Sequence, residues 1–149
     1  MTLQPRVGVV LVGHGDTASH LLAAARRIAP PESLDDVVAI DAGEGETPHL
    51  GSALCTAIED ADHGHGVLLM VDLLGASPWR CAQRECAGHP FVVLSGLNLA
   101  MLLKLAALDR AFMTPVQMAE ACADSARRAV DLRSSPDAGA GIIVERGGG

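Results

Sequence analysis

Two titratable residues stand at the ends of apolar runs. His14 follows the run at 7–12 and lies between two glycines, and Asp72 follows the run at 67–71. Such runs, apolar on both faces, are typical of strands buried in the middle of a parallel sheet. Ligands of open α/β sheets bind at the carboxyl ends of these strands. A histidine and a carboxylate at that edge predict a chemically active site.

The chemistry that fits this pair is transfer of a phosphoryl group to the imidazole. If Asp72 accepts a hydrogen bond from one ring nitrogen of His14, it fixes the tautomer and leaves the lone pair of the other nitrogen facing outward. The same carboxylate stabilises the positive charge that develops as that nitrogen attacks phosphorus. An alternative that the residues leave open is that Asp72 caps a turn.

A cradle for phosphate oxygens is predicted just after Asp72. Ser77-Pro78 is typical of a helix start, where backbone N–H groups and the positive end of the helix dipole attract phosphate. Gly15, Gly75 and Ala76 allow close approach to the oxygens, and the Ser77 hydroxyl can donate a further hydrogen bond. Ser77 is equally explained as a plain N-cap.

The elements that must position these residues alternate between strands and helices. Expected strands are 7–12, 37–40, 67–71 and 91–95, with a last short strand at 141–145. Expected helices start after Asp16, at Pro48, at Ser77, after Asn98 and at Pro115, the last reaching about Leu132. Asp16 and Asn98 are expected to cap their helices, and Thr114 with Gln117 is expected to form a capping box. This alternation predicts an α/β fold: a doubly wound, mainly parallel sheet flanked by helices. A strand order 2-1-3-4 would place His14 and Asp72 at neighbouring strand ends.

Composition restricts the class of protein. The chain has 149 residues, and we expect one domain at 1–133 followed by a linker, a short strand and a flexible tail at 134–149. The net charge is −7 and Lys and Arg form no cluster, which disfavours nucleic acid and anionic membranes as partners. No apolar run approaches the roughly 20 residues of a membrane span, and no export pattern precedes 7–12. We therefore expect a cytoplasmic protein with reduced cysteines and no membrane insertion.

Three motifs together resemble the mannose-type enzyme IIA of the phosphoenolpyruvate:sugar phosphotransferase system (PTS). They are Val-Gly-His14-Gly, Val71-Asp72-Leu-Leu-Gly-Ala-Ser-Pro78 and Ser95-Gly-Leu-Asn-Leu-Ala-Met-Leu102, within residues 7 to 132. The resemblance implies that His14 accepts a phosphoryl group from phospho-HPr and passes it to an enzyme IIB. It implies that Asp72 hydrogen-bonds His14 and that Ser77 helps to bind the phosphoryl group. It also implies a homodimer that exchanges a C-terminal strand, for which 142–145 is the candidate, and no cofactor.

Several residues near this edge are candidates for docking the partner proteins. Leu73, Leu74, Trp79 and Asn98 lie in or beside the motifs, and the apolar ones are equally explained as ordinary packing. The sequence departs from the family at Gly13, Leu74 and Ala100, which affects partner preference more than chemistry.

Two other functions are compatible with the sequence. Leu11-Val-Gly-His-Gly15 also resembles the start of sirohydrochlorin or cobalt chelatases, which need a second metal-binding histidine across a cleft. Asp72 stands at that position, and we interpret His63 and His65 as a solvated turn rather than as metal ligands. The second alternative is a regulatory module that keeps the fold without serving transport.

Overall fold

The computed structural model describes residues 5–43, 48–73 and 89–138. In these ranges the sheet has four parallel strands in the order β2-β1-β3-β4. The strands are β1 (Gly8–Gly13), β2 (Val38–Asp41), β3 (Val67–Val71) and β4 (Phe91–Ser95). The predicted order and the predicted α/β class are both confirmed.

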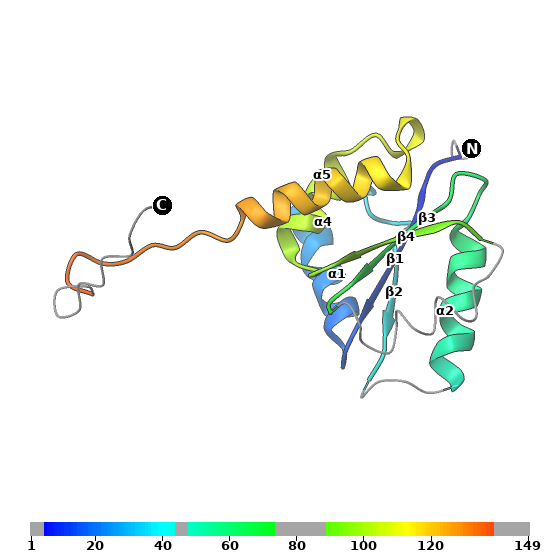
Figure 1. The fold of residues 1–149 in the computed structure, drawn as a ribbon, viewed down its shortest axis with the longest axis horizontal. Coiled ribbons are helices and arrows are strands. Elements are labelled where there is room, and N and C mark those ends of the chain that lie inside the picture. The colour runs from blue at the N-terminus through cyan, green and yellow to red at the C-terminus, as the bar shows by residue number, and fades with distance from the viewer. Residues whose placement is uncertain (1–4, 44–47, 74–88, 139–149) are drawn as a thin grey trace.

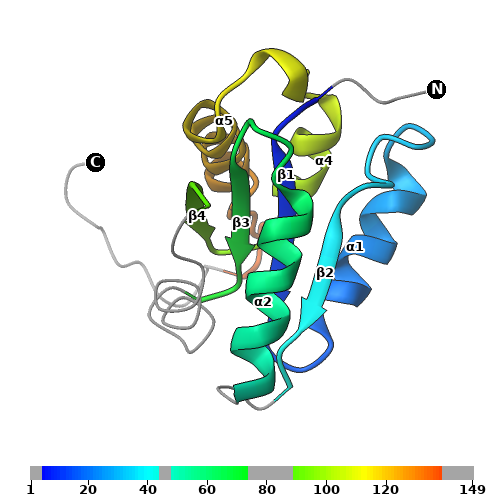
Figure 2. The ribbon, with the colours of Figure 1, turned by 90° about the vertical axis from the view of Figure 1, so that its right-hand side faces the viewer.

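Helices cover both faces of this sheet. They are α1 (Thr17–Ile28), α2 (Pro48–Ala61), α4 (Leu99–Ala107) and α5 (Pro115–Arg128), with a short 3₁₀ helix η1 (Arg110–Phe112) between the last two. Figure 1 shows α1, α4 and α5 on one side of the strands and α2 on the other. Figure 2 shows α2 alone in front of the sheet among the labelled helices.

The alternation of side chains along β1 divides the core into two parts. Val9 and Leu11 are fully buried against α1, α4 and α5, whereas Val10 and Val12 are fully buried against α2. Each face therefore receives branched aliphatic side chains, as the apolar run predicts. At Gly8 a Cβ atom would come within 2.1 Å of the Ala61 carbonyl oxygen, so the close approach of α2 to β1 requires glycine there.

Helix caps explain where two of the predicted helices begin. The Asn98 side chain accepts a hydrogen bond from the Met101 backbone N–H at 2.9 Å, and α4 follows. Thr114 and Gln117 form a reciprocal capping box at the start of α5. Both caps are confirmed.

The structure corrects four predictions about elements. Asp16 occupies the N-cap position of α1, but its side chain makes no capping hydrogen bond. The helix α5 ends at Arg128 rather than at about Leu132, since Val130 and Leu132 are 84% and 94% exposed and bury no apolar face. Strands β1 and β2 each lie one residue later than the predicted 7–12 and 37–40. The predicted helix at 77–86 and strand at 141–145 lie outside the described residues.

Candidate functional site

His14 and Asp72 meet at the carboxyl edge of the sheet. His14 follows β1 and Asp72 follows β3, and these two strands are hydrogen-bonded neighbours. The Nδ1 atom of His14 lies 3.0 Å and 3.2 Å from the two carboxylate oxygens of Asp72. The predicted pairing of the two side chains is therefore present, although they are 58 residues apart in the sequence.

The Asp72 carboxylate is held by backbone groups as well as by the ring. It accepts hydrogen bonds from the backbone N–H of His14 at 2.9 Å and from that of Leu73 at 2.8 Å. Burial raises the pKa of Asp72, but these hydrogen bonds and the one from the His14 ring outweigh it, so the pKa lies below its ordinary value. Asp72 is therefore an ionised hydrogen-bond acceptor at neutral pH.

An ionised carboxylate determines the tautomer of the imidazole. Because a carboxylate accepts but cannot donate, Nδ1 of His14 carries the proton that the two groups share. Nε2 is then the nitrogen with a free lone pair, on the side of the ring away from Asp72. The His14 side chain is 39% exposed and that of Asp72 is 18% exposed, so the carboxylate is the more deeply placed member of the pair.

The turn around His14 is built from backbone hydrogen bonds. Gly15 adopts φ = +58°, a left-handed conformation that favours glycine. Its N–H donates to the Gly43 carbonyl at 2.8 Å, and the Gly43 N–H donates back at 3.3 Å. The His14 carbonyl accepts hydrogen bonds from the Thr17 N–H at 3.1 Å and the Thr17 hydroxyl at 2.6 Å. Gly15 therefore shapes the turn, and its amide is already bonded within the protein.

Other predicted site residues divide into two groups. Leu73 is 64% exposed beside Asp72, and the side-chain oxygen of Asn98 accepts the hydrogen bond that caps α4. Leu74, Gly75, Ala76, Ser77 and Trp79 lie outside the described residues. The predicted oxyanion cradle and part of the predicted docking surface thus remain predictions.

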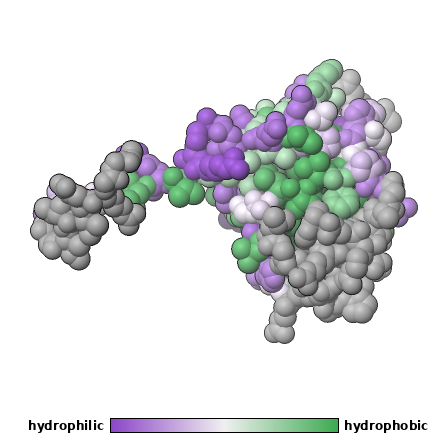
Figure 3. Space-filling view, in the orientation of Figure 1, coloured by the Kyte–Doolittle hydropathy of each residue, from purple (hydrophilic) through white to green (hydrophobic). Residues whose placement is uncertain are grey.

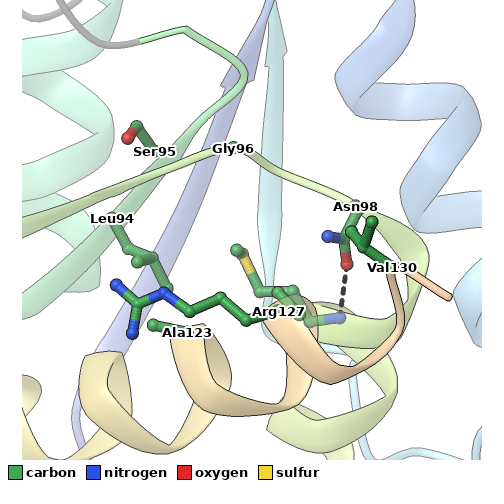
Figure 4. Close-up of a pocket in the computed structure, with 9 residues that line it drawn as sticks. Leu94, Ser95, Gly96, Asn98, Ala123, Arg127 and Val130 are labelled. Carbon is green, nitrogen blue, oxygen red and sulfur yellow. Dashed lines mark hydrogen bonds between the residues drawn. The ribbon is translucent and has the colours of Figure 1, made fainter. Parts of the chain in front are cut away.

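A pocket that was not predicted from the sequence opens beside the end of β4. It has a volume of about 280 Å³, and its lining comes from β4, α4 and α5. In Figure 4 the Arg127 side chain extends from α5 toward Leu94, while Ser95 and Gly96 lie along the pocket's upper side. The Gly96 N–H donates to the Asp72 main-chain carbonyl at 3.1 Å, which connects this loop to the His14 site. Part of the lining lies in the motif at 95–102, but the part from α5 is distant in the sequence, so the motif alone could not indicate the pocket.

The histidines at 63 and 65 lie far from this edge along β3. Both are exposed, in the turn that precedes the strand, whereas Asp72 follows it. Among residues 5–43, 48–73 and 89–138, no group of three or more His, Cys, Asp or Glu side chains is arranged to hold a metal ion.

Comparison with known proteins shows which family shares this arrangement. Residues 8–123 match the EIIA-man family, described as the PTS system fructose IIA component. The chain belongs to the EIIA-man family of PTS IIA components. It is 29% identical over 103 residues to YadI of Escherichia coli (strain K12), which carries the name of a phosphotransferase enzyme IIA component; the match covers 68% of this chain and 69% of YadI.

Solved structures share the fold of this IIA component. The mannose/sorbose specific IIA subunit from Enterococcus faecalis is 25% identical, with a TM-score of 0.73 over 91% of this chain and 98% of that one. The EIIA component from Streptococcus agalactiae is 24% identical, with a TM-score of 0.71 over 84% and 95%. The resemblance of the sequence to mannose-type enzyme IIA is therefore confirmed, and the protein is a phosphocarrier component of the PTS. In the described part of this IIA component, no helix combines the length and hydrophobicity of a membrane span.

Proposed function

We propose that His14 accepts a phosphoryl group on Nε2 from phospho-HPr and passes it to an enzyme IIB. The observation that carries this proposal is the contact of His14 Nδ1 with both oxygens of an ionised Asp72. This contact directs the other ring nitrogen outward with its lone pair available. Membership of the EIIA-man family supplies the class of reaction.

The proposed step is a displacement at phosphorus. The Nε2 lone pair forms a bond to phosphorus, the bond from phosphorus to the donor histidine breaks, and its electron pair returns to the donor nitrogen. The His14 ring keeps its Nδ1 proton and becomes positively charged as the new bond forms. Asp72 stabilises that charge through the hydrogen bonds already in place, so little reorganisation is needed during transfer. Transfer to enzyme IIB is the same step in reverse, with a new acceptor.

The terminal oxygens need donors close to Nε2. Ser77 is a proposed donor by resemblance to the family, and Gly75 and Ala76 are proposed to allow close approach of the oxygens to the backbone N–H groups at the predicted helix start. Gly15 contributes space rather than its amide, because its N–H is bonded to Gly43. Leu73, with its exposed side chain, is a proposed contact for the partner proteins, together with Leu74, Trp79 and Asn98.

A homodimer formed by exchange of residues 142–145 is a second part of the proposal. Two features of the described residues support it. β4 is the last strand of the described sheet, and apolar side chains gather on the face that includes it (Figure 3). Residues 130–138, which follow α5, leave the body without forming a helix or strand (Figure 1). The exposed apolar side chains of this segment, Val130 and Leu132, are suited to burial against a second copy of the chain.

The experiment that tests the phosphocarrier function is a reconstituted relay. The chain is incubated with phosphoenolpyruvate, enzyme I and HPr, and the acid-labile phosphate is located by mass mapping. We expect the label on His14 and its absence in His14→Ala, with His63→Ala as a control that removes an exposed histidine at the opposite edge. Label that persists in His14→Ala would contradict the proposal. Adding the enzyme IIB proteins of the same cell then tests onward transfer, which a phosphocarrier performs and a regulatory module that retains the label does not.

A further inference from the structure

A side chain from β2 holds the start of α1, the helix that directly follows the His14 turn. Asp41 Oδ1 accepts a hydrogen bond from the Ser19 backbone N–H at 3.0 Å, and Oδ2 accepts one from the Ser19 hydroxyl. Ser19 is the third residue of α1, so its N–H is one of the amides that a capping side chain normally satisfies. Asp16, in the N-cap position, makes no such hydrogen bond. Asp41 therefore caps α1 from a different element.

The segment that carries His14 is tied to residues 41–43 on both sides of the imidazole. Before it, the Ala42 N–H donates to the Gly13 carbonyl at 2.8 Å. After it, Gly15 and Gly43 form an isolated antiparallel bridge. These ties are made by the backbone and survive most substitutions. The tie at Ser19 depends on a side chain, so mutation can remove it.

The first turn of α1 is built directly on His14. The His14 carbonyl accepts hydrogen bonds from both the N–H and the hydroxyl of Thr17, the first residue of the helix. If the first turn of α1 frays at Ser19, the hydrogen bonds from Thr17 to the His14 carbonyl weaken, and the backbone of His14 becomes more mobile. The ring must stay within hydrogen-bond distance of Asp72 for its tautomer to be fixed.

We propose that Asp41 is a positioning residue for His14: by capping α1, it holds the imidazole in register with Asp72. The consequence for the rate of phosphoryl transfer rests on the proposed function. The consequence for the His14 tautomer does not, because it concerns the protein alone.

Three variants of the full-length chain test this proposal. Asp41→Ala removes both hydrogen bonds and the charge, whereas Asp41→Asn removes the charge but keeps an oxygen that can accept from the Ser19 N–H. Asp62→Ala is the matched control. Asp62 also accepts hydrogen bonds from backbone amides, those of Gly64 and Gly66 at 2.9 Å and 3.2 Å, but at the opposite edge of the sheet.

Two measurements are made on each variant. The first is the ¹⁵N shift of the His14 ring nitrogens, which reports how much of the ring has its proton on Nδ1. The second is the rate of His14 phosphorylation by phospho-HPr, resolved into kcat and KM. In Asp41→Ala we expect the ring shifts to move toward the average of the two tautomers and kcat to fall roughly tenfold with KM unchanged. In Asp41→Asn we expect ring shifts and kcat close to those of the wild type, and in Asp62→Ala we expect wild-type values of both.

Each contrary outcome overturns the proposal. Wild-type shifts and kcat in Asp41→Ala would show that the cap does not position the ring. An equal loss in Asp41→Asn would assign the effect to charge, and an equal loss in Asp62→Ala would assign it to general destabilisation. If Asp41→Ala does not fold, Ser19→Ala replaces it, with an expected loss of about twofold in kcat; wild-type values there would overturn the proposal. If phospho-HPr does not label the wild type, the proposed function fails while the ring shifts still decide the role of Asp41.

Discussion

The direction of the His14 ring follows from the groups around Asp72 rather than from the histidine itself. Two backbone amides and Nδ1 converge on one carboxylate, and their hydrogen bonds keep it ionised. A similar pair, His89 with Asp62 at 3.1 Å, lies at the opposite edge of the sheet. A histidine–carboxylate contact alone therefore does not define the site; its position at the carboxyl edge does.

Asp72→Asn tests the role of the carboxylate at the residue scale. An asparagine amide can donate to Nδ1, which moves the ring proton to Nε2 and blocks its lone pair. We expect the initial rate of His14 phosphorylation to fall by about 10²-fold or more. Asp62→Asn is the matched control, because it changes the other histidine–carboxylate pair and should leave the rate unchanged. A rate in Asp72→Asn close to that of the wild type would show that the ring does not depend on this carboxylate.

The rate of phosphoryl transfer should also depend on pH. Protonation of Nε2 removes the nucleophilic lone pair, so we expect the single-turnover rate to decrease with acid between about pH 8 and pH 5. The pKa of Asp72 is lower in the folded protein than in the unfolded chain, where it is about 4. The ionised carboxylate therefore contributes fully to the free energy of unfolding above about pH 4, and this contribution is lost only as the pH falls through the lowered pKa. Asp72 thus stays ionised throughout this range. A rate that does not change from pH 5 to 8 would contradict the assigned nucleophile.

At the scale of elements, a buried arginine connects η1 to the segments that precede β1 and β2 at the amino edge of the sheet. Arg110 in η1 is 3% exposed, donates to the Val7 carbonyl at 3.2 Å and pairs with Asp36. Arg6 pairs with the same carboxylate at 2.9 Å. Burial raises the pKa of Asp36, but the two guanidinium groups outweigh it and the pKa lies below its ordinary value. This cluster fixes the start of β1, the strand that His14 directly follows.

The two ion pairs of Asp36 should differ in their contribution to stability. Asp36→Ala leaves the buried guanidinium of Arg110 without its carboxylate, and we expect it to lower the free energy of unfolding by about 3 kcal/mol. Arg6→Ala removes a partly exposed partner and should cost less than about 1 kcal/mol. Urea unfolding followed by circular dichroism measures both. Equal losses in the two variants would contradict this account of the cluster.

Local signals in the sequence predicted most of the elements but not the contacts between them. The capping box at Thr114 and the cap at Asn98 involve residues three apart, so their spacing is visible in the sequence. Asp16 has the right type and place for a cap, yet Asp41 performs that role from another strand. Arg110 was likewise not predicted, because its partners are 74 and 103 residues away. Such pairs depend on the order of the strands in the sheet, and the hydrophobic periodicity within one segment does not determine that order.

At the scale of the whole molecule, the alternation of strands and helices predicted the class of fold, and the assumed strand order proved correct. That order is what brings His14 and Asp72 together, so the central pair of the site was predictable once the order was assumed. The pocket beside Arg127 was not, because its lining is shared among three elements. The segment at 75–77 stays a prediction, since it lies outside the described residues.

The proposed homodimer gives a prediction at this scale. We expect the full-length chain to sediment as a dimer and a chain that ends at Arg133 to sediment as a monomer, because the latter lacks the strand to be exchanged. Sedimentation equilibrium over a range of concentrations distinguishes the two states. Leu132→Asp in the full-length chain is expected to weaken the dimer if this exposed side chain is buried between the copies. A full-length chain that is monomeric at all concentrations would contradict the exchange.

The central claim is that Asp72 holds Nδ1 of His14 and leaves Nε2 to carry the phosphoryl group. The most direct measurement is heteronuclear NMR of the phosphorylated protein labelled with ¹⁵N-histidine. The account predicts a single His14 signal in which Nε2 is coupled to phosphorus and Nδ1 retains its proton. Coupling of phosphorus to Nδ1, or to any histidine other than His14, would contradict it.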